Sequence, residues 1–257
     1  MKVDFGKTAG DYGQYRAGFP GEFFDRLFSI GYVRSGQAVL DLGTGTGTVA
    51  RDLALRGCRV VGLDPAQELL DEATRLDSEA RAGVRYIKAT AENTGLPSQA
   101  FDVVTAAQCW HWFDRPRAAA EARRVLRPRG RIIIAHRDWL PLPGNVVEAT
   151  ERLIMKHNPE WKLGGGTGVY PTTLTDLSVS GFSDIETFSF DAPVPYSHEA
   201  WLGRIRASAG VAASLSEDAV RHFDDDLADV LAANFPQEPL LIPHRNWTAT
   251  AISNDQH

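Results

Sequence analysis

The stretch "DLGTGTG", Asp41–Gly47, contains the residues whose spacing most clearly suggests chemistry. Gly43, Gly45 and Gly47 alternate with other residues directly after a short apolar run. A glycine turn between a strand and a helix lets the backbone approach a nucleotide-like cofactor closely. The spacing here is GxGxG, whereas dinucleotide-binding turns usually read GxGxxG. Spacing alone therefore indicates a cofactor turn without choosing the cofactor.

Two carboxylates narrow the choice of cofactor. Asp41 stands at the mouth of the turn, where its charge would repel a pyrophosphate and attract a cation. S-adenosylmethionine carries an ammonium and a sulfonium group and has no phosphate. Asp64 ends the next apolar run, where an acid accepts hydrogen bonds from ribose hydroxyls in either S-adenosylmethionine or NAD. Together the two acids favour S-adenosylmethionine, and a dehydrogenase using NAD is the weaker alternative.

The elements around this turn must place it at the edge of a sheet. Between Ala38 and Ala135, strand-like runs alternate with helix-like segments. The strand-like runs are Ala38–Gly43, Arg59–Asp64, Val84–Ala89, Phe101–Ala107 and Arg131–Ala135. Such alternation predicts an α/β fold with βαβ units and a doubly wound, mostly parallel sheet. Its ligand crevice is expected at the carboxyl ends of the strands, where both acids lie.

After the fifth strand the alternation stops. Residues 137–180 contain several prolines, the amphipathic segment Val146–His157 and the glycine run Gly164–Gly168. We interpret this region as a cap insertion over the substrate. The predicted organisation is a lid segment at 1–36, a cofactor-binding core at 37–136, a substrate cap at 137–180, and the remainder of the core at 181–257. Within that last region, helices are expected near His198–Ala207 and Glu217–Asn234, and strands at Phe182–Phe190 and His244–Ile252.

The composition limits the class of protein. The 257 residues are 43% hydrophobic and 23% charged, with a formal net charge of −6, which is typical of a soluble globular protein. This balance gives no indication of a nucleic-acid-binding domain. No apolar run reaches the roughly 20 residues of a membrane span, and the polar N-terminus does not resemble a signal peptide. Cys58 and Cys109 suit a reducing compartment, so we expect a cytoplasmic protein.

The chain resembles the class I S-adenosylmethionine-dependent methyltransferases. The matching segments, in order, are "VLDLGTGTG" (39–47), "VVGLDPAQELLDEA" (60–73), "ATAENTGLP" (89–97), "FDVVTAAQCWHWFD" (101–114) and "EARRVLRPRGRIIIA" (121–135). The segments "CWHWFD" and "YGQYRAGFP" are similar to the subgroup that includes trans-aconitate methyltransferases. The resemblance implies a seven-stranded, Rossmann-like sheet, in which Phe182–Phe190 and His244–Ile252 form the closing antiparallel pair.

The resemblance also implies the cofactor contacts. Gly43, Gly45 and Gly47 would let the backbone approach S-adenosylmethionine, Asp41 would hold its ammonium, and Asp64 its ribose. Where the family often has an acid for the adenine amino group, this chain has Thr90, followed by Ala91 and Glu92, so that contact stays open. The other expected cofactor residues are Pro65, Gln67, Gln108 and Tyr15.

The loop after the fourth strand supplies candidates for the reaction itself. His111 lies among aromatic residues where the sulfonium is expected, and a histidine suits a general base near neutral pH. His136 follows the fifth strand and is the second base candidate; the alternative for His111 is a packing role. The expected substrate residues are Tyr12, Arg16, Trp110, Trp112 and Trp139. Arg16 would suit a carboxylate acceptor, whereas His111 and the tryptophans would suit a phenol or an aromatic carbon.

The predicted function is S-adenosylmethionine-dependent methyl transfer to a small-molecule acceptor, a specialised metabolite methylated at an aromatic carbon, nitrogen or oxygen or at a carboxylate. S-adenosylhomocysteine would be the spent cofactor. No metal is expected, because the histidines and cysteines lack ligand spacing. No nucleic-acid or membrane partner is expected, and the oligomeric state is left open. The alternatives are a methyltransferase acting on RNA or protein and a non-catalytic module that binds an adenosyl cofactor.

Overall fold

The computed structural model describes residues 18–208, 210–212 and 214–254. They fall into two compact units. The sheet unit comprises Gly18–Arg137, Tyr170–Phe190 and the residues from Asn246 onward. The helical unit comprises Asp138–Val169 and Asp191–Arg245. Three long strands contribute residues to both units, and each unit is described by itself below.

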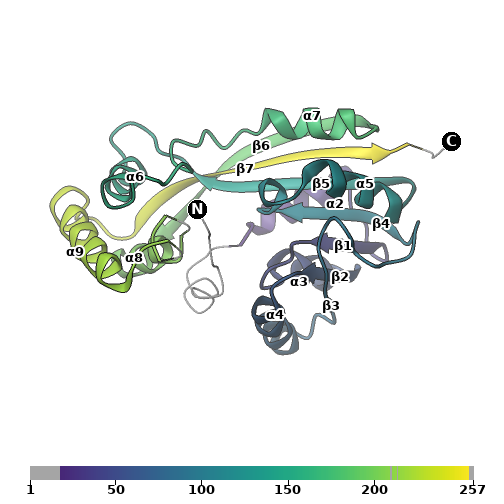
Figure 1. The fold of residues 1–257 in the computed structure, drawn as a ribbon, viewed down its shortest axis with the longest axis horizontal. Coiled ribbons are helices and arrows are strands. Elements are labelled where there is room, and N and C mark those ends of the chain that lie inside the picture. The colour runs from purple at the N-terminus through teal and green to yellow at the C-terminus, as the bar shows by residue number, and fades with distance from the viewer. Residues whose placement is uncertain (1–17, 209, 213, 255–257) are drawn as a thin grey trace. The chain divides into compact units, whose positions relative to one another are not determined.

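Seven strands form one sheet in the order β3-β2-β1-β4-β5-β7-β6 (Figure 1). Their bounds are β1 Ala38–Leu42, β2 Arg59–Asp64, β3 Arg85–Lys88, β4 Phe101–Ala107, β5 Leu126–Trp139, β6 Phe182–Tyr196 and β7 Leu240–Ser253. The first five strands pair in parallel, and the register sets Asp41 between Gly62 and Thr105. The predicted doubly wound, Rossmann-like sheet is confirmed.

Helices cover both faces of the sheet unit because its central strands are apolar on both sides. The bounds are α2 Gly21–Ile30, α3 Thr48–Leu55, α4 Gln67–Ala80, α5 Arg115–Val125 and α7 Pro171–Val179, with a 3-10 turn, η2, at Trp110–Trp112. Along β1, Val39 packs with α2 and α3, whereas Leu40 packs with α5 and α7. This alternation follows from the two-residue period of a strand. The strand ends where the ligand crevice is predicted are therefore held by strands that pack against helices on both faces.

The helical unit has its own apolar core. Its helices are α6 Val146–His157, α8 His198–Arg206 and α9 Glu217–Asn234, which closely match the predicted segments. Trp161 and Trp201 are buried in this core. The unit differs from the predicted cap at 137–180, because α6 packs with α8 and α9 from far along the chain, while α7 belongs to the sheet unit. Such long-range packing has no local sequence signal.

The last three strands are longer than predicted. The sequence pattern placed them at Arg131–Ala135, Phe182–Phe190 and His244–Ile252. Pro193 and Pro195 lie within β6. Because β6 is the last strand in the sheet order, one of its edges needs no ladder partner, and an edge strand tolerates proline.

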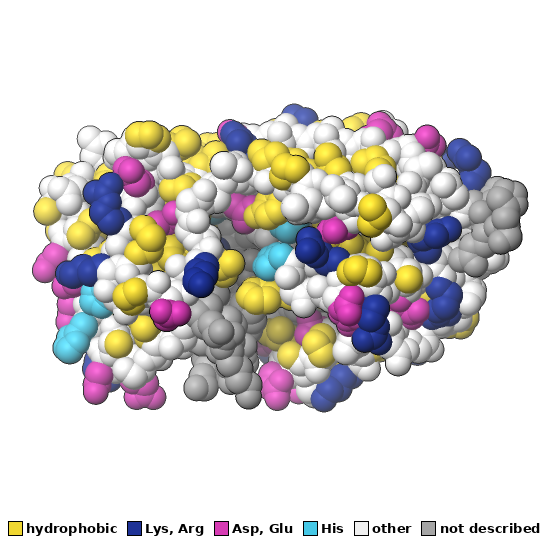
Figure 2. Space-filling view, turned by 45° about the horizontal axis from the view of Figure 1, so that its top comes forward, with side chains coloured by type: hydrophobic (Ala, Val, Ile, Leu, Met, Phe, Trp, Pro, Cys, Tyr) yellow, Lys and Arg dark blue, Asp and Glu magenta, His cyan; other side chains and the backbone are white. Residues whose placement is uncertain are grey.

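On the face shown in Figure 2, acidic and basic side chains are interspersed, and no large area of one sign is visible. Within the described residues, no helix combines the length and the apolar composition that crossing a membrane requires. This face gives no support to a nucleic-acid surface, which would need a concentrated basic area.

Candidate functional site

The glycine turn after β1 has a backbone that only glycine adopts easily. Gly43, Gly45 and Gly47 all have positive φ angles, of 60°, 55° and 75°. A Cβ at Gly43 would lie 2.8 Å from the Cβ of Cys109, so that glycine is required by packing within the protein. At Gly45 a Cβ would meet no atom of the described residues within 4 Å. Gly45 is therefore the point where the turn opens to a ligand.

Asp64 fixes the open part of the turn. It is the last residue of β2 and is buried, and its Oδ2 accepts a hydrogen bond of 3.0 Å from the backbone N–H of Gly45. Its Oδ1 accepts a second, of 2.9 Å, from the N–H of Ala66. Burial raises the pKa of this carboxyl group, while both backbone donors oppose the shift. A carboxylate has about four lone-pair sites, so it can still accept from ribose hydroxyls.

Asp41 is more deeply enclosed than a direct ligand contact suggests. It is 2% exposed; its Oδ2 accepts from the Thr44 hydroxyl and its Oδ1 from the Thr105 hydroxyl, both at 2.6 Å. Burial raises its pKa to about 6, despite both hydroxyl donors. The carboxylate joins β1, the glycine turn and β4. The sequence reasoning missed both contacts of Asp41: Thr44 lies within the turn itself, whereas the contact with Thr105 depends on the register of β1 and β4.

The residues expected near the adenine lie after β2 and β3. Pro65 and Gln67 are exposed, and the Gln67 amide donates to Asp71. Thr90 is exposed and Ala91 is buried. A cofactor contact by any of these residues stays a prediction: Pro65, Gln67, Thr90 and Ala91.

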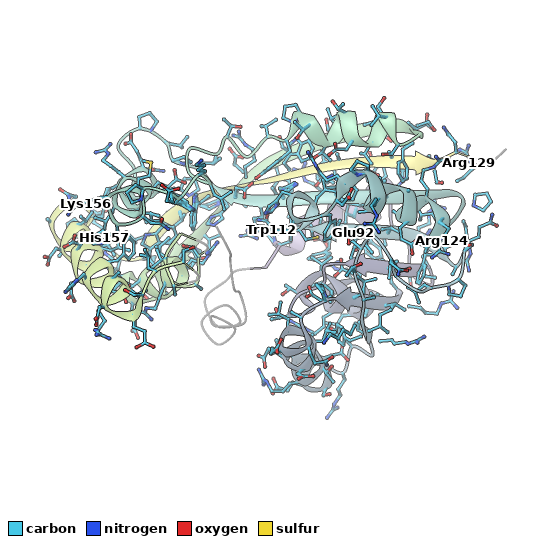
Figure 3. All side chains as sticks on the ribbon, viewed as in Figure 1. Glu92, Trp112, Arg124, Arg129, Lys156 and His157 are labelled. Atoms are coloured by element: carbon cyan, nitrogen blue, oxygen red, sulfur yellow. The ribbon has the colours of Figure 1, made fainter. Side chains whose placement is uncertain are left out.

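Glu92 is already committed within the protein. Its Oε1 accepts a 2.9 Å hydrogen bond from the backbone N–H of Asp114, which caps helix α5. In Figure 3, Glu92 lies toward Trp112, whereas Arg124 and Arg129 lie away from it, toward the other end of α5. The contact ties the loop after β3 to the loop after β4. An adenine contact by Glu92 would have to share this carboxylate.

Gln108 turns the chain at the end of β4. Its φ is 60°, which is uncommon for a residue other than glycine. Its backbone N–H donates to the Ala135 carbonyl at 2.8 Å, and its side-chain amide donates to the Arg137 carbonyl. The amide group is therefore engaged with β5 rather than directed freely to a cofactor. The loop carrying His111 starts from this fixed residue.

The aromatic residues of that loop have different environments. Trp110 is 1% exposed, and its indole N–H donates to Asp176 at 3.0 Å. The side chain is thus part of the core, which argues against the substrate contact predicted for Trp110. Trp112 is 48% exposed, and the His111 ring is exposed beside it, with 4.7 Å between the ring centroids. His111 and Trp112 keep the accessibility that a substrate contact requires.

His136 lies at the carboxyl end of β5 and is 1% exposed. Its ring stacks on Tyr170 with 3.6 Å between centroids, and lies 5.9 Å from the ring of His111 and 6.1 Å from that of Trp247. Burial, and then the charge of His111, lower the pKa of His136 to about 3. The imidazole is therefore neutral near pH 7 and has little tendency to take up a proton.

The remaining predicted substrate residues are not part of this cluster. Trp139 belongs to the helical unit, where its indole N–H donates to Glu151 at 2.7 Å and its ring packs against Trp201. Tyr12, Tyr15 and Arg16 lie outside the described residues. Conversely, Tyr170 and Trp247 contact His136, although nothing local in the sequence connects them with it.

Comparison with known sequences agrees with this arrangement. Residues 40–134 match the family described as "Methyltransferase domain". A protein of Mycobacterium tuberculosis named as an uncharacterized methyltransferase is 39% identical over 132 residues, which are 51% of this chain and 51% of that protein. The match thus spans about half the length of the curated relative.

Solved structures share the fold over most of the chain. The YcgJ protein of Bacillus subtilis has a TM-score of 0.60 at 19% identity, covering 92% of this chain and all of that one. Phosphoethanolamine N-methyltransferase 2 of Haemonchus contortus, solved with S-adenosyl-L-methionine, has a TM-score of 0.58 at 20% identity, covering 98% of this chain and 57% of that one. At these identities the likeness concerns the fold. Residues 40–134 therefore match a methyltransferase domain, and the chain shares its fold with these solved structures.

Proposed function

We propose that the protein transfers the methyl group of S-adenosylmethionine to a small-molecule acceptor. The observation that carries the proposal is the turn at Gly45, which has a positive φ, is held by Asp64, and faces open space. Such a backbone admits a ligand at the place where the adenosyl cofactor binds in this fold. The trans-aconitate subgroup and the cytoplasmic location stay predictions.

The residues present fit the cofactor chemically. The Asp64 carboxylate keeps lone pairs for the ribose hydroxyls. Asp41 places negative charge behind the turn, which favours a cationic amino acid moiety over a pyrophosphate. Because both Asp41 oxygens accept from threonines, its effect on the ammonium is expected to act through charge and through the shape of the turn.

S-adenosylmethionine supplies an electrophilic methyl group, so the protein mainly has to orient the acceptor and, for a protonated acceptor, remove its proton. We assign the base to His111, because it is exposed in the loop after β4. His136 is the weaker base candidate, because burial keeps its pKa at about 3. Trp112 offers an exposed aromatic surface beside His111.

A small acceptor is favoured over RNA by the net charge of −6 and by the mixed charges on the face in Figure 2. A non-catalytic binding module is the second candidate, and it predicts cofactor binding without turnover. Incubating a metabolite extract with S-adenosylmethionine labelled in its methyl group distinguishes the two. Mass spectrometry should detect a labelled product, and an unlabelled extract with intact cofactor would favour the binding module.

A matched pair of glycine variants tests the cofactor site. Gly45→Ala and Gly36→Ala both place an alanine at a positive φ, and in neither case would the new Cβ lie within 4 Å of an atom in the part of the chain that the structure describes. We expect similar backbone strain, about 1–2 kcal/mol in each. Only the Cβ at position 45 would occupy ligand space, so isothermal titration should show S-adenosylmethionine affinity reduced at least about tenfold in Gly45→Ala alone, about 1.4 kcal/mol.

The control is informative because Gly36 precedes β1, at the end opposite the turn. Equal affinities of the two variants would argue against a ligand at Gly45. Wild-type protein that binds NADH tightly, and does not bind S-adenosylmethionine, would overturn the proposed function.

A further inference from the structure

His136 has hydrogen-bonding groups that the protein does not use. The side chain is 1% exposed, yet neither ring nitrogen has a hydrogen-bond partner among the residues that the structure describes. A neutral imidazole has one N–H donor and one acceptor nitrogen. Leaving both unsatisfied inside a protein is costly, and such groups are rare. The ring must therefore gain something that outweighs this cost.

Within the described residues, His136 is surrounded by aromatic rings and has no carboxylate partner. The Tyr170 ring stacks on the face of the His136 ring with an interplanar angle of 15°. The ring centroids of Trp247 and Tyr170 are 5.6 Å apart. Stacking occupies the face of the imidazole, so its nitrogens are reached along the ring edge. The neighbouring guanidinium on β5, that of Arg137, donates to the Gly18 carbonyl.

The strand order places His136 beyond the cofactor. The turn at Gly45 follows β1, the ribose acid Asp64 ends β2, and β3 lies outside β2. The sheet continues in the other direction through β4, which precedes His111, to β5, which carries His136. A cofactor extending from β1 toward β3 leaves the ends of β4 and β5 to the acceptor. This step rests on the proposed function.

We propose that His136 is a specificity-determining residue whose ring edge binds a hydroxyl group on a planar, aromatic acceptor. A hydroxyl both donates and accepts, which complements the two nitrogens of a neutral imidazole. A carboxylate only accepts and would leave the acceptor nitrogen unsatisfied. The stacked rings of His136 and Tyr170, with the exposed Trp112, supply aromatic surface for the acceptor ring.

Phenol and toluene test the proposal as a pair of probes, because they have similar rings and only phenol carries a hydroxyl. Their affinities are measured by ligand-observed NMR on the full chain loaded with S-adenosylhomocysteine. In His136→Phe, which keeps an aromatic ring and removes both nitrogens, phenol should bind about three- to tenfold more weakly. Toluene affinity should be unchanged. Equal changes for both probes, or unchanged phenol affinity, would overturn the proposal.

Thermal unfolding separates this role from a structural one. Replacing an unsatisfied polar group by an apolar one is neutral or stabilising, so His136→Phe should keep or raise the Tm. Thr248→Val is the matched control, because the Thr248 hydroxyl is also buried without a partner in the described part of the chain. It should keep the Tm and the phenol affinity.

The two proposals fail in different ways. If S-adenosylhomocysteine does not bind, the proposed function fails, and the phenol–toluene comparison is run on the protein alone. If it binds and His136→Phe leaves phenol binding intact, only the role of His136 fails. A marked loss of Tm in His136→Phe would assign the residue to packing and also contradict the proposal.

Discussion

In the sheet unit, the carboxyl ends of β1 and β2 differ from the carboxyl end of β5 in how their buried polar groups are satisfied. At the β1 and β2 end, both oxygens of Asp41 and of Asp64 accept hydrogen bonds from the protein. At the β5 end, His136 is as deeply buried, and neither of its nitrogens has such a partner within the described residues. The hydrogen bonds at the β1 and β2 end are therefore formed without a ligand. At the β5 end, the proposed acceptor would supply the missing hydrogen bonds of His136. This difference suits a site in which one end always binds the same cofactor and the other end selects a particular acceptor.

Burial also acts on the two ends with opposite sign. It raises the pKa of Asp41 to about 6 and lowers that of His136 to about 3. In both cases the neutral form is favoured, as expected when a charge loses solvent. The carboxylate at the cofactor end is therefore partly protonated in mild acid, while the imidazole at the acceptor end stays neutral.

The largest expected effect concerns the reaction at the acceptor end. His111→Gln should lower kcat by about 10²- to 10³-fold for an acceptor that loses a proton, the contribution typical of a general base. The affinity for S-adenosylmethionine should not change, because the cofactor end is intact. Steady-state kinetics with the labelled acceptor, together with titration calorimetry, measure both quantities.

Trp112→Phe is the control for that variant, since it alters the same exposed loop without removing a titratable group. An unchanged kcat in His111→Gln would assign His111 to packing and leave the acceptor end without a base. A joint loss of cofactor affinity would remove the functional separation between the two ends.

The next effect concerns the pH dependence of stability at the cofactor end. The folded-state pKa of Asp41 lies above its unfolded value of 3.8, so its contribution to stability is full below pH 4 and is lost as the pH rises through about 6. The free energy of unfolding of wild type minus that of Asp41→Asn should therefore fall by on the order of 2–3 kcal/mol between pH 4 and 7.

Urea denaturation at several pH values measures this difference, and Asp71→Asn, at an exposed acid, is the control. A constant difference for Asp41 would show that its carboxylate keeps an ordinary pKa, and the electrostatic contrast between the two ends would then be absent.

The smallest expected effect separates the two tryptophans beside His111. Trp110→Phe removes a hydrogen bond to the Asp176 carboxylate and should cost about 2 kcal/mol of stability with little change in KM for the acceptor. Trp112→Phe should leave stability within about 0.5 kcal/mol, because the side chain is 48% exposed. Chemical denaturation and acceptor kinetics check both; a raised KM in Trp110→Phe would return Trp110 to the substrate site.

Local patterns were sufficient for much of the fold. Helix α6 coincides with the amphipathic segment Val146–His157, and α9 formed where a helix was expected, near Glu217–Asn234. The apolar runs predicted Arg59–Asp64 and Phe101–Ala107. The predictions were less accurate where contacts between residues far apart in the sequence determine the extent of an element. Pro193 did not end β6, because the sheet order makes it an edge strand.

The site divides in the same way. That Gly45 and Asp64 lie close together was predictable, because the turn and the acid belong to one βαβ unit and follow a local spacing. The Thr105 hydroxyl on Asp41 and the Tyr170 ring on His136 depend on strand register and on packing between remote segments. A single sequence carries no signal for such pairs. The engagement of Trp110 with Asp176 was missed for the same reason.

Gln108 has a consequence for protein engineering. Its backbone and side-chain amides bind the carbonyls of Ala135 and Arg137, which flank His136, and the loop with His111 begins directly after it. The segment with His111 and the segment with His136 are therefore linked by hydrogen bonds and should be exchanged together. Exchanging residues 108–113 alone, to change the range of acceptors, would alter the hydrogen bonds of Gln108 to β5. An active chimera therefore has to take residues 135–137 from the same donor protein.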